Sequence, residues 1–146
     1  SLGLLHSEYR TLTLQGTDLS GNRLPFAPKL TAQLGMEWDM LELGGGKLTF
    51  APNVTYSSQQ YFSPFNAENV AGSPQNNAEL QQGANAKVNA SLSWSNDVVT
   101  VRAFANNLFN KETYGYGLDL RGAGFPYNFL VPSAPRTYGV SARFSF

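Results

Sequence analysis

The sequence predicts an all-β protein: an antiparallel transmembrane β-barrel segment of about six strands. Three observations lead to this fold class, namely regular alternation of apolar and polar residues, connections that alternate between long and short, and aromatic residues grouped at two depths. Side chains two positions apart lie on the same face of a strand, so each alternating segment has one apolar and one polar face. The prediction is a sheet with an apolar side and a polar side.

Composition excludes several other classes. The 146 residues amount to about one domain, with ten basic and ten acidic residues and a formal net charge of zero, so we expect no nucleic-acid partner. No apolar run approaches the roughly 20 residues of a membrane-spanning helix. Strands with alternating residues, in contrast, can cross a membrane even when the average composition of the chain is polar. Cysteine is absent, which excludes a disulfide framework and a thiolate metal site.

The last eleven residues predict a closing strand. Tyr138, Val140, Ala142, Phe144 and Phe146 share one face, whereas the residues between them are small, polar or cationic. An amphipathic strand of a soluble sheet can alternate in the same way. A complete apolar face that ends on an aromatic residue is typical of the closing strand of a bacterial outer-membrane barrel.

Five further strands are predicted before it, at residues 2–14, 29–40, 47–62, 83–95 and 98–107. The strand at 29–40 alternates most regularly and is long enough to cross a bilayer. Pro52 lies inside the strand at 47–62 and has no N–H to donate to a neighbouring strand, which disfavours a central position there.

The connections between these strands differ in length. Segments 15–28, 63–82 and 108–135 are long, and we expect 63–82 to be a disordered segment or a surface loop. Segments 41–46 and 95–97 are short, and Gly, Asn and Asp in them favour tight turns. Transmembrane barrels have short periplasmic turns and long extracellular loops. The alternation therefore predicts the short turns and the chain end on the periplasmic side.

Aromatic residues are then sorted by depth. Trp38, Trp94, Phe144 and Phe146 fall near the short turns, and Tyr138 falls toward the opposite rim. Such residues form the membrane girdles of outer-membrane barrels, and a soluble sandwich has no reason to sort its aromatics in this way. The face predicted to contact outer-membrane lipid comprises Leu30, Ala32, Leu34, Met36, Val88, Ala90, Leu92, Val140, Ala142 and Phe144.

No arrangement of residues predicts catalysis, a cofactor or a metal site, so we expect no enzyme. His6, the one histidine, is expected to form hydrogen bonds on the polar face of the first strand. Glu37 and Asp39 share a face, and we expect them to pair with cations of neighbouring strands rather than to act as paired catalytic carboxylates. The candidate partners are Lys29, Lys87, Arg102 and Arg143.

The last long loop contains the candidate ligand-binding residues. It begins within Asn106–Asn110, whose side-chain amides can cap backbone groups at the strand end. Tyr114, Tyr116, Arg121 and Tyr127 follow, and aromatic faces with a guanidinium suit a bulky anionic or aromatic ligand. The alternative is that these residues only pack the loop into a lid.

Three segments resemble a known family: SGNRLPFAPKLTAQLG (20–35), NNLFNKETYGYG (106–117) and PRTYGVSARFSF (135–146). In this order they look like parts of a TonB-dependent outer-membrane receptor. The resemblance implies a plugged barrel of about twenty-two strands that imports ferric siderophores, haem, cobalamin or oligosaccharides. It also implies energy from the TonB complex, through a short N-terminal box, and recognition of the terminal strand by the barrel-assembly machinery.

About six strands are present, without the plug domain or the energy-coupling box, so we expect residues 1–146 to be the C-terminal part of a longer receptor. Two open sheet edges cannot face lipid, and the segment alone is expected neither to close nor to insert. The expected function is import of a ferric siderophore, the commonest substrate class that the resemblance implies. A complete small outer-membrane barrel with a structural or adhesive role and a soluble sugar-binding sheet protein stay as alternatives.

Overall fold

The computed structural model describes residues 1–67, 77–120, 124–125 and 127–146. The strands of its main sheet are β1 (Leu2–Leu4), β4 (Leu30–Gly35), β5 (Trp38–Leu43), β6 (Gly46–Ser57), β9 (Asn85–Ser95), β10 (Val99–Asn106) and β13 (Thr137–Phe144). The connections hold β2 (Thr13–Leu14), β3 (Thr17–Asp18), β7 (Gln60–Tyr61), the 3-10 helix η1 (Asn77–Glu79), β8 (Gln81–Gln82), β11 (Tyr114–Asp119) and β12 (Asn128–Pro132).

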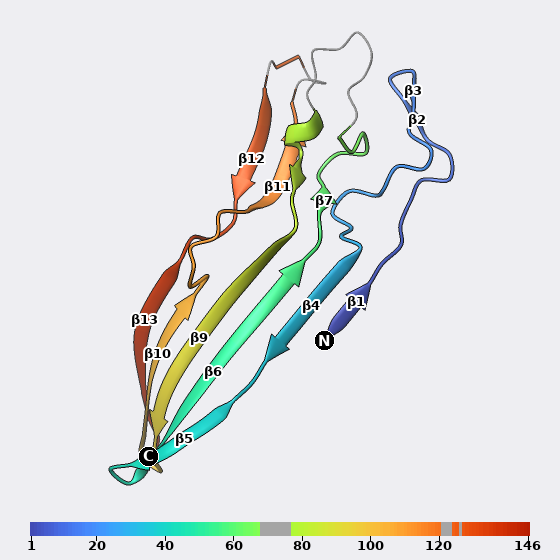
Figure 1. The fold of residues 1–146 in the computed structure, drawn as a ribbon. Coiled ribbons are helices and arrows are strands. Elements are labelled where there is room, and N and C mark those ends of the chain that lie inside the picture. The colour runs from blue at the N-terminus through green and yellow to red at the C-terminus, as the bar shows by residue number, and fades with distance from the viewer. Residues whose placement is uncertain (68–76, 121–123, 126) are drawn as a thin grey trace.

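The main sheet is antiparallel throughout, in the order β1-β4-β6-β9-β10-β13, and β5 extends the row of β4 along β6. Six rows therefore lie side by side, each next to its neighbour in the sequence (Figure 1). The predicted all-β, antiparallel sheet of about six strands is confirmed. Its order is that of an up-and-down sheet, and the described strands do not close it, because β1 and β13 lie at opposite edges.

The pairing register keeps apolar residues on one face across the whole sheet. One row of cross-strand partners on this face runs through Phe50, Leu92, Ala103 and Val140. The row through Lys87 and Thr55 to Gln33 belongs to the opposite, polar face. Because a slip of one residue would move every side chain to the other face, the agreement along all these strands confirms the faces predicted from alternation.

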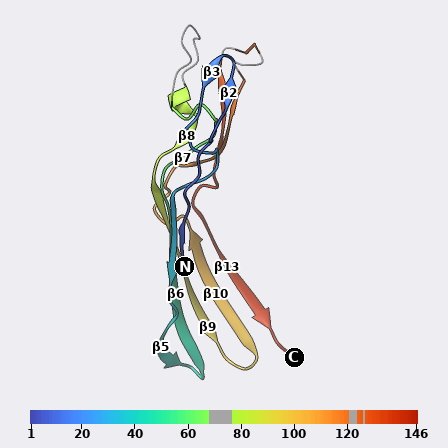
Figure 2. The ribbon, with the colours of Figure 1, turned by 90° about the vertical axis from the view of Figure 1, so that its right-hand side faces the viewer.

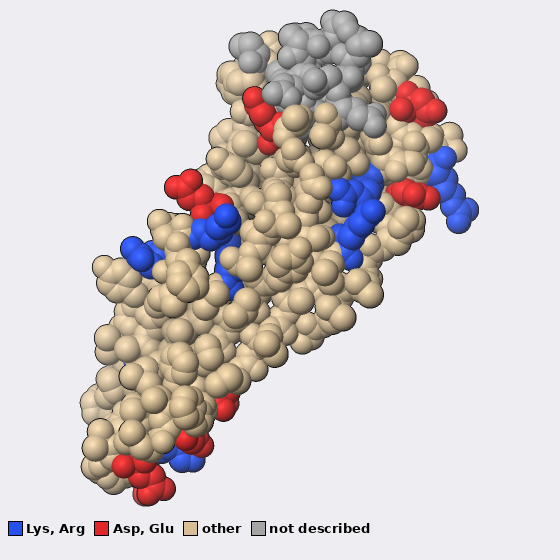
Figure 3. Space-filling model, viewed as in Figure 1, with Lys and Arg blue, Asp and Glu red and all other residues tan. Residues whose placement is uncertain are grey.

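The sheet has no second layer on either face in the described part of the chain (Figure 2). The buried apolar side chains of the described residues are Leu19, Phe62, Phe65 and Leu80, all in the connections. On the apolar face Leu34 is 76% exposed. Figure 3 shows a broad surface without charged residues between the charged tip of the short turns and the loop end. An uncharged surface that exposes large apolar side chains such as Leu34 is typical of contact with another molecule or with lipid.

Pro52 explains the one break in the row formed by β4 and β5. Gly35 pairs with Asn53 and Trp38 with Phe50, so the register continues across the gap at Met36 and Glu37. The Met36 N–H donates to the Pro52 carbonyl at 3.2 Å, but proline has no N–H with which to complete the pair. The proline therefore lies within a continuous β6, and the interruption appears in the neighbouring strand.

The first predicted strand, at 2–14, is wrong in length. β1 ends at Leu4, and beyond Leu5 the backbone bonds to the following loop instead of to the main sheet. The Tyr9 N–H donates to the Asn22 carbonyl at 2.9 Å, and the Gly21 N–H donates back to Tyr9 at 2.8 Å. These bonds replace the ladder that alternation alone predicted.

The long connections are also more ordered than expected. The β2-β3 hairpin spans the start of the loop predicted at 15–28, and the β11-β12 hairpin lies within 108–135. In the described part of the segment predicted as a disordered or surface loop, the chain forms an ordered loop in which Ser63, Phe65 and Leu80 are buried. Residues 68–76 of the segment lie outside the described residues.

The two short turns lie at one end of the sheet, with the chain's last residues, and the long connections lie at the other (Figure 1). Gly44 and Gly45 join β5 to β6 with φ of +60° and +76°, which glycine adopts without steric cost. In the β9-β10 turn the Asn96 side chain accepts hydrogen bonds from the N–H groups of Val98 and Val99. The predicted sorting of connections by length is confirmed.

Candidate ligand site at the long-loop end

Hydrogen bonds join the three long connections into one structure beyond the sheet. The Phe26 N–H donates to the Tyr61 carbonyl at 2.8 Å, which joins the first connection to the second. The Tyr114 N–H donates to the Gln82 side-chain oxygen at 2.6 Å, which joins the second to the third. Residues far apart in the sequence therefore meet at the end of the sheet that is opposite the short turns.

An aromatic cluster lies between these connections. The Phe26 ring is 5.6 Å from the Tyr116 ring and nearly parallel to it, and 5.5 Å from the Phe62 ring. A Cβ on Gly117 would lie 2.5 Å from the Phe62 ring, so only glycine allows this approach of β11. Tyr116, a predicted ligand residue, thus packs in the cluster, as the lid alternative requires, while 43% of the residue stays exposed.

Arg23 provides a cation next to this cluster that sequence reasoning missed. Its guanidinium lies 4.5 Å from the centre of the Tyr61 ring, within the range of a cation–π contact. Its backbone N–H donates to the Asn66 side-chain oxygen at 3.0 Å, and the Asn66 amide donates to the Arg23 carbonyl at 2.9 Å. Nothing in the local sequence of this turn-rich segment signals either partner, because both lie in the next connection.

The β2-β3 hairpin uses its carboxylate internally. Ser20 donates to the Asp18 Oδ1 atom through its backbone N–H at 2.9 Å and through its hydroxyl at 2.6 Å. The hydroxyl bond, followed by the backbone bond, holds the pKa of Asp18 below its ordinary value. Asp18 therefore stabilises the turn in its charged form.

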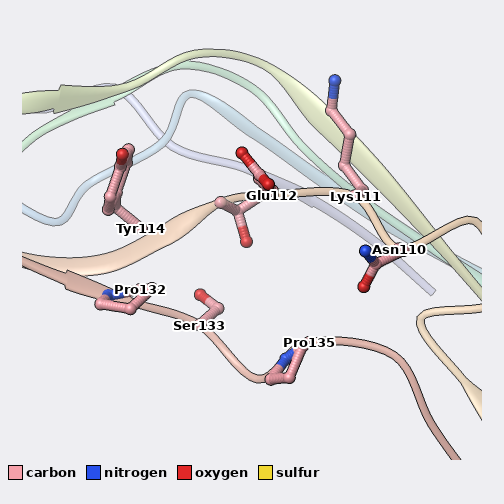
Figure 4. Close-up of a pocket in the computed structure, with 8 residues that line it drawn as sticks. Asn110, Lys111, Glu112, Tyr114, Pro132, Ser133 and Pro135 are labelled. Carbon is pink, nitrogen blue, oxygen red and sulfur yellow. The ribbon is translucent and has the colours of Figure 1, made fainter.

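Tyr114, another predicted ligand residue, lines a cavity of about 300 Å³ at the base of the β11-β12 hairpin. The start of β11 forms one wall and the chain after β12 forms the other, with the Lys111 amine directed away (Figure 4). The buried Thr113 hydroxyl has no hydrogen-bond partner in the described part of the chain. The lining residues are Asn110, Lys111, Glu112, Thr113, Tyr114, Pro132, Ser133 and Pro135.

The remaining predicted ligand residues do not gather at this cavity. Tyr127 precedes β12 and contacts Phe125, with the ring centres 5.9 Å apart. The register pairs Tyr114 with Pro132 and Asp119 with Asn128, so Tyr127 lies toward the other end of the hairpin. At about 3.3 Å per strand residue this is on the order of 15 Å from Tyr114. Arg121 lies outside the described residues.

On the polar face, Asp39 pairs with a cation of the neighbouring strand as predicted, but that cation is Lys47 and not one of the four candidates. Asp39 pairs with Lys47, with the Lys47 amine 3.0 Å from its Oδ2 atom, and accepts a hydrogen bond from the Thr49 hydroxyl at 2.8 Å. Lys47 follows the tight turn after β5, so the ladder itself brings it near Asp39. Glu37 has no ion pair among the described residues.

Residues predicted to form the girdles lie at the expected ends of the strands. Trp38 pairs with Phe50 near the glycine turn, and the Trp94 indole N–H donates to the Leu43 carbonyl at 2.7 Å. Phe144 pairs with Val99, beside the other short turn, and Phe146 follows it. Tyr138 lies at the opposite end of β13 and is 79% exposed. Their role as a membrane girdle stays a prediction.

The described residues hold no cluster of His, Cys, Asp and Glu that could bind a metal ion. His6 lies beyond the end of β1 and not on a strand, which corrects its predicted place; its imidazole is exposed and 3.6 Å from Glu8. No helix in the described ranges is long and apolar enough to cross a membrane.

Similar folds occur in solved receptors. The ferric yersiniabactin uptake receptor FyuA from Yersinia pestis matches with a TM-score of 0.70 and 22% identity, over 88% of this chain and 18% of its own. BauA, the ferric preacinetobactin receptor from Acinetobacter baumannii, gives 0.62 and 26%, over 85% and 16%. The siderophore receptor PiuA, also from Acinetobacter baumannii, gives 0.63 and 18%, over 90% and 16%. The chain spans less than a fifth of each receptor.

A search of curated proteins gave no match. The family model described as TonB dependent receptor-like, beta-barrel matches residues 3–108, which is well over half of the chain. That match includes β1 to β10, and the open antiparallel sheet agrees with the receptor folds. The chain therefore belongs to the TonB-dependent receptor β-barrel family, whose members are transport receptors and not enzymes.

Proposed function

We propose that this chain is the C-terminal barrel segment of an outer-membrane receptor that binds a ferric siderophore and imports it with energy from TonB. The observation that carries the proposal is the likeness to BauA, a ferric preacinetobactin receptor, at 26% identity over 85% of the chain. The chain covers only 16% of BauA, so the plug, the contact with TonB and most of the ligand site belong to the rest of the receptor.

The membrane position follows from the two faces of the sheet. The apolar face, with Leu34, Val88 and Val140, contacts outer-membrane lipid, and the polar face lines the lumen. The short turns lie in the periplasm and the long connections outside the cell. We propose that the barrel-assembly machinery recognises β13 and Phe146, and that Trp38, Trp94, Tyr138, Phe144 and Phe146 lie at the membrane interfaces.

The chemistry of the loop end supports a bulky, oxygen-rich and anionic ligand. The Arg23 guanidinium lies on the Tyr61 ring, and Phe26 and Tyr116 stack nearby. Aromatic faces stack on planar ligand groups, and a guanidinium binds oxyanions through paired hydrogen bonds. Ferric complexes of siderophores present such groups, and an extracellular position lets these residues meet the ligand before it enters the lumen.

Uptake of radioactive iron tests the proposal. Cells that lack the full receptor, grown without iron, are given a panel of ⁵⁵Fe-loaded siderophores and compared with cells in which the gene is restored. We expect uptake of at least one complex to require both the receptor and TonB. If cells without the receptor lose haem or cobalamin uptake but take up every siderophore normally, the ligand is not a siderophore. The receptor would then still be a transporter.

Arg121 provides a sharper test of ligand capture by the last long loop. If Arg121 hydrogen-bonds an anionic ligand, Arg121→Ala should weaken binding by about 1.5–3 kcal/mol and leave insertion intact. Arg10→Ala, at an exposed arginine of the first connection, is the matched control. Binding is measured on full-length receptor at equal surface abundance. Unchanged affinity together with altered protease cleavage of the loop would mean that the residue only packs a lid.

A further inference from the structure

Two arginines share a hollow on the polar face of the sheet. Arg102 of β10 pairs with Ser141 of β13, and Thr100 pairs with Arg143, so the arginines are diagonal neighbours on adjacent strands. Diagonal positions of an antiparallel pair lie about 7–8 Å apart, within reach of long side chains. The same four residues line a hollow of about 270 Å³.

The polar side-chain groups of the four lining residues are two guanidiniums and two hydroxyls. In the described part of the chain neither arginine forms an ion pair. Asp39 is already engaged by Lys47, and Glu42 pairs with Lys47 in the ladder. Glu37 lines a wider, adjacent hollow with Arg102 but does not reach it as an ion pair. The positive charge of the site is thus uncompensated within the described residues.

Two arginines at this position whose positive charge is not neutralised are expected to bind an anion. Like charges directly opposite each other destabilise a sheet, and two guanidiniums at diagonal positions also repel each other. Charged residues within membrane-spanning segments face the protein interior or a cavity and pair with an opposite charge there. Two guanidiniums and two hydroxyls offer a carboxylate more donors than its two oxygens need, in the forked geometry that favours bidentate binding.

We propose that Arg102 and Arg143, with Thr100 and Ser141, form an oxyanion site on the luminal wall that binds one carboxylate. The carboxylate comes either from an Asp or Glu of the receptor outside residues 1–146 or from a carboxylate-bearing ligand that enters the lumen. The site requires the barrel that the family match establishes. It does not require that the imported ligand be a siderophore.

Carbodiimide coupling tests the first source, because it joins lysine but not arginine to a carboxylate in contact. Full-length receptor with Arg102→Lys or Arg143→Lys is treated and mapped by mass spectrometry. We expect a crosslink from position 102 or 143 to an acidic residue elsewhere in the receptor. Lys47, which contacts Asp39 at 3.0 Å, serves as the internal positive control, and wild-type receptor shows the background at the two arginine positions.

Citrate, a free tricarboxylate, tests the second source by calorimetric titration. Against wild-type receptor, the double variant Arg102→Gln/Arg143→Gln should bind citrate about tenfold or more weakly, while Arg136→Gln, at the exposed start of the closing strand, should bind it normally. A crosslink would mean that the carboxylate at the site belongs to the receptor. Weaker citrate binding by the double variant would mean that the carboxylate belongs to a ligand. The proposal is overturned if Lys47 couples to Asp39, neither arginine position couples, and the wild-type receptor binds citrate no more tightly than the double variant does, which includes no binding at all.

Discussion

At the scale of single residues, Asn107 determines how the last long connection leaves the sheet. The residue is 5% exposed with a φ of +50°, a conformation that asparagine tolerates better than most residues. Its side chain accepts a hydrogen bond from the Lys111 N–H at 2.8 Å and donates to the carbonyls of Lys111 and Ala134. Its own N–H donates to the Asn89 side chain at 2.9 Å. The predicted capping role of the Asn106–Asn110 segment is confirmed.

Asn107→Ala should loosen this connection. The substitution leaves the Lys111 N–H and two carbonyls without their hydrogen-bond partner. Each of these groups that stays buried and is not hydrated should lower the free energy of unfolding by about 1–3 kcal/mol. We expect a lower melting temperature of full-length receptor and faster protease cleavage within 108–135. Asn107→Gly also removes the side-chain hydrogen bonds, but glycine adopts a positive φ without strain. Comparing it with Asn107→Ala separates the loss of these hydrogen bonds from the cost of backbone strain. Asn106→Ala, which loses one exposed contact to Thr137 at 3.3 Å, is the control. Equal effects at 106 and 107 would disprove the proposed role of the Asn107 hydrogen bonds.

At the scale of elements, alternation predicted the long strands and failed in the connections. β6, β9, β10 and β13 each have one apolar parity, the pattern that strands of transmembrane barrels keep along their whole length. Pro52 is unfavourable in a central strand, yet its effect appears in the neighbouring strand, at Met36 and Glu37, because the missing N–H belongs to a pair of residues on two strands. Residues 6–11 alternate as well, yet the backbone groups of Tyr9 bond to Gly21 and Asn22 within the first connection. Pattern alone does not reveal which partner a segment meets.

The two faces of β4 offer a direct test of the membrane assignment. Leu34→Arg should cost about 2–4 kcal/mol in full-length receptor, because the charge would face lipid, whereas Gln33→Arg should cost little. Both residues are exposed in the sheet and adjacent in sequence, which makes them a matched pair. Ser91 is a poorer polar-face control, since it is only 9% exposed. Folding is measured by denaturant titration in lipid vesicles, and equal tolerance at the two positions would contradict the register or the membrane-facing side.

At the scale of the whole molecule, the candidate site was predictable only within one connection. Tyr114 and Tyr116 were placed correctly in the loop end, because aromatic residues concentrate in the last connection. Arg23, Tyr61 and Phe26 were missed, because their contacts join the first connection to the second. Such a site depends on the order of the sheet, which brings the three long connections to one end.

The open edges of this sheet determine how residues 1–146 should behave when they are expressed alone. The described strands leave one side of β1 and one side of β13 without a partner, and unpaired N–H and carbonyl groups cannot be exposed to lipid. Residues 1–146 expressed alone should therefore not give a heat-modifiable, protease-protected barrel in vesicles, whereas the full receptor should. A folded species from the segment alone, with the electrophoretic shift of a closed barrel, would favour a complete small barrel with a structural or adhesive role. The two outcomes differ because only the longer receptor supplies strands for both edges.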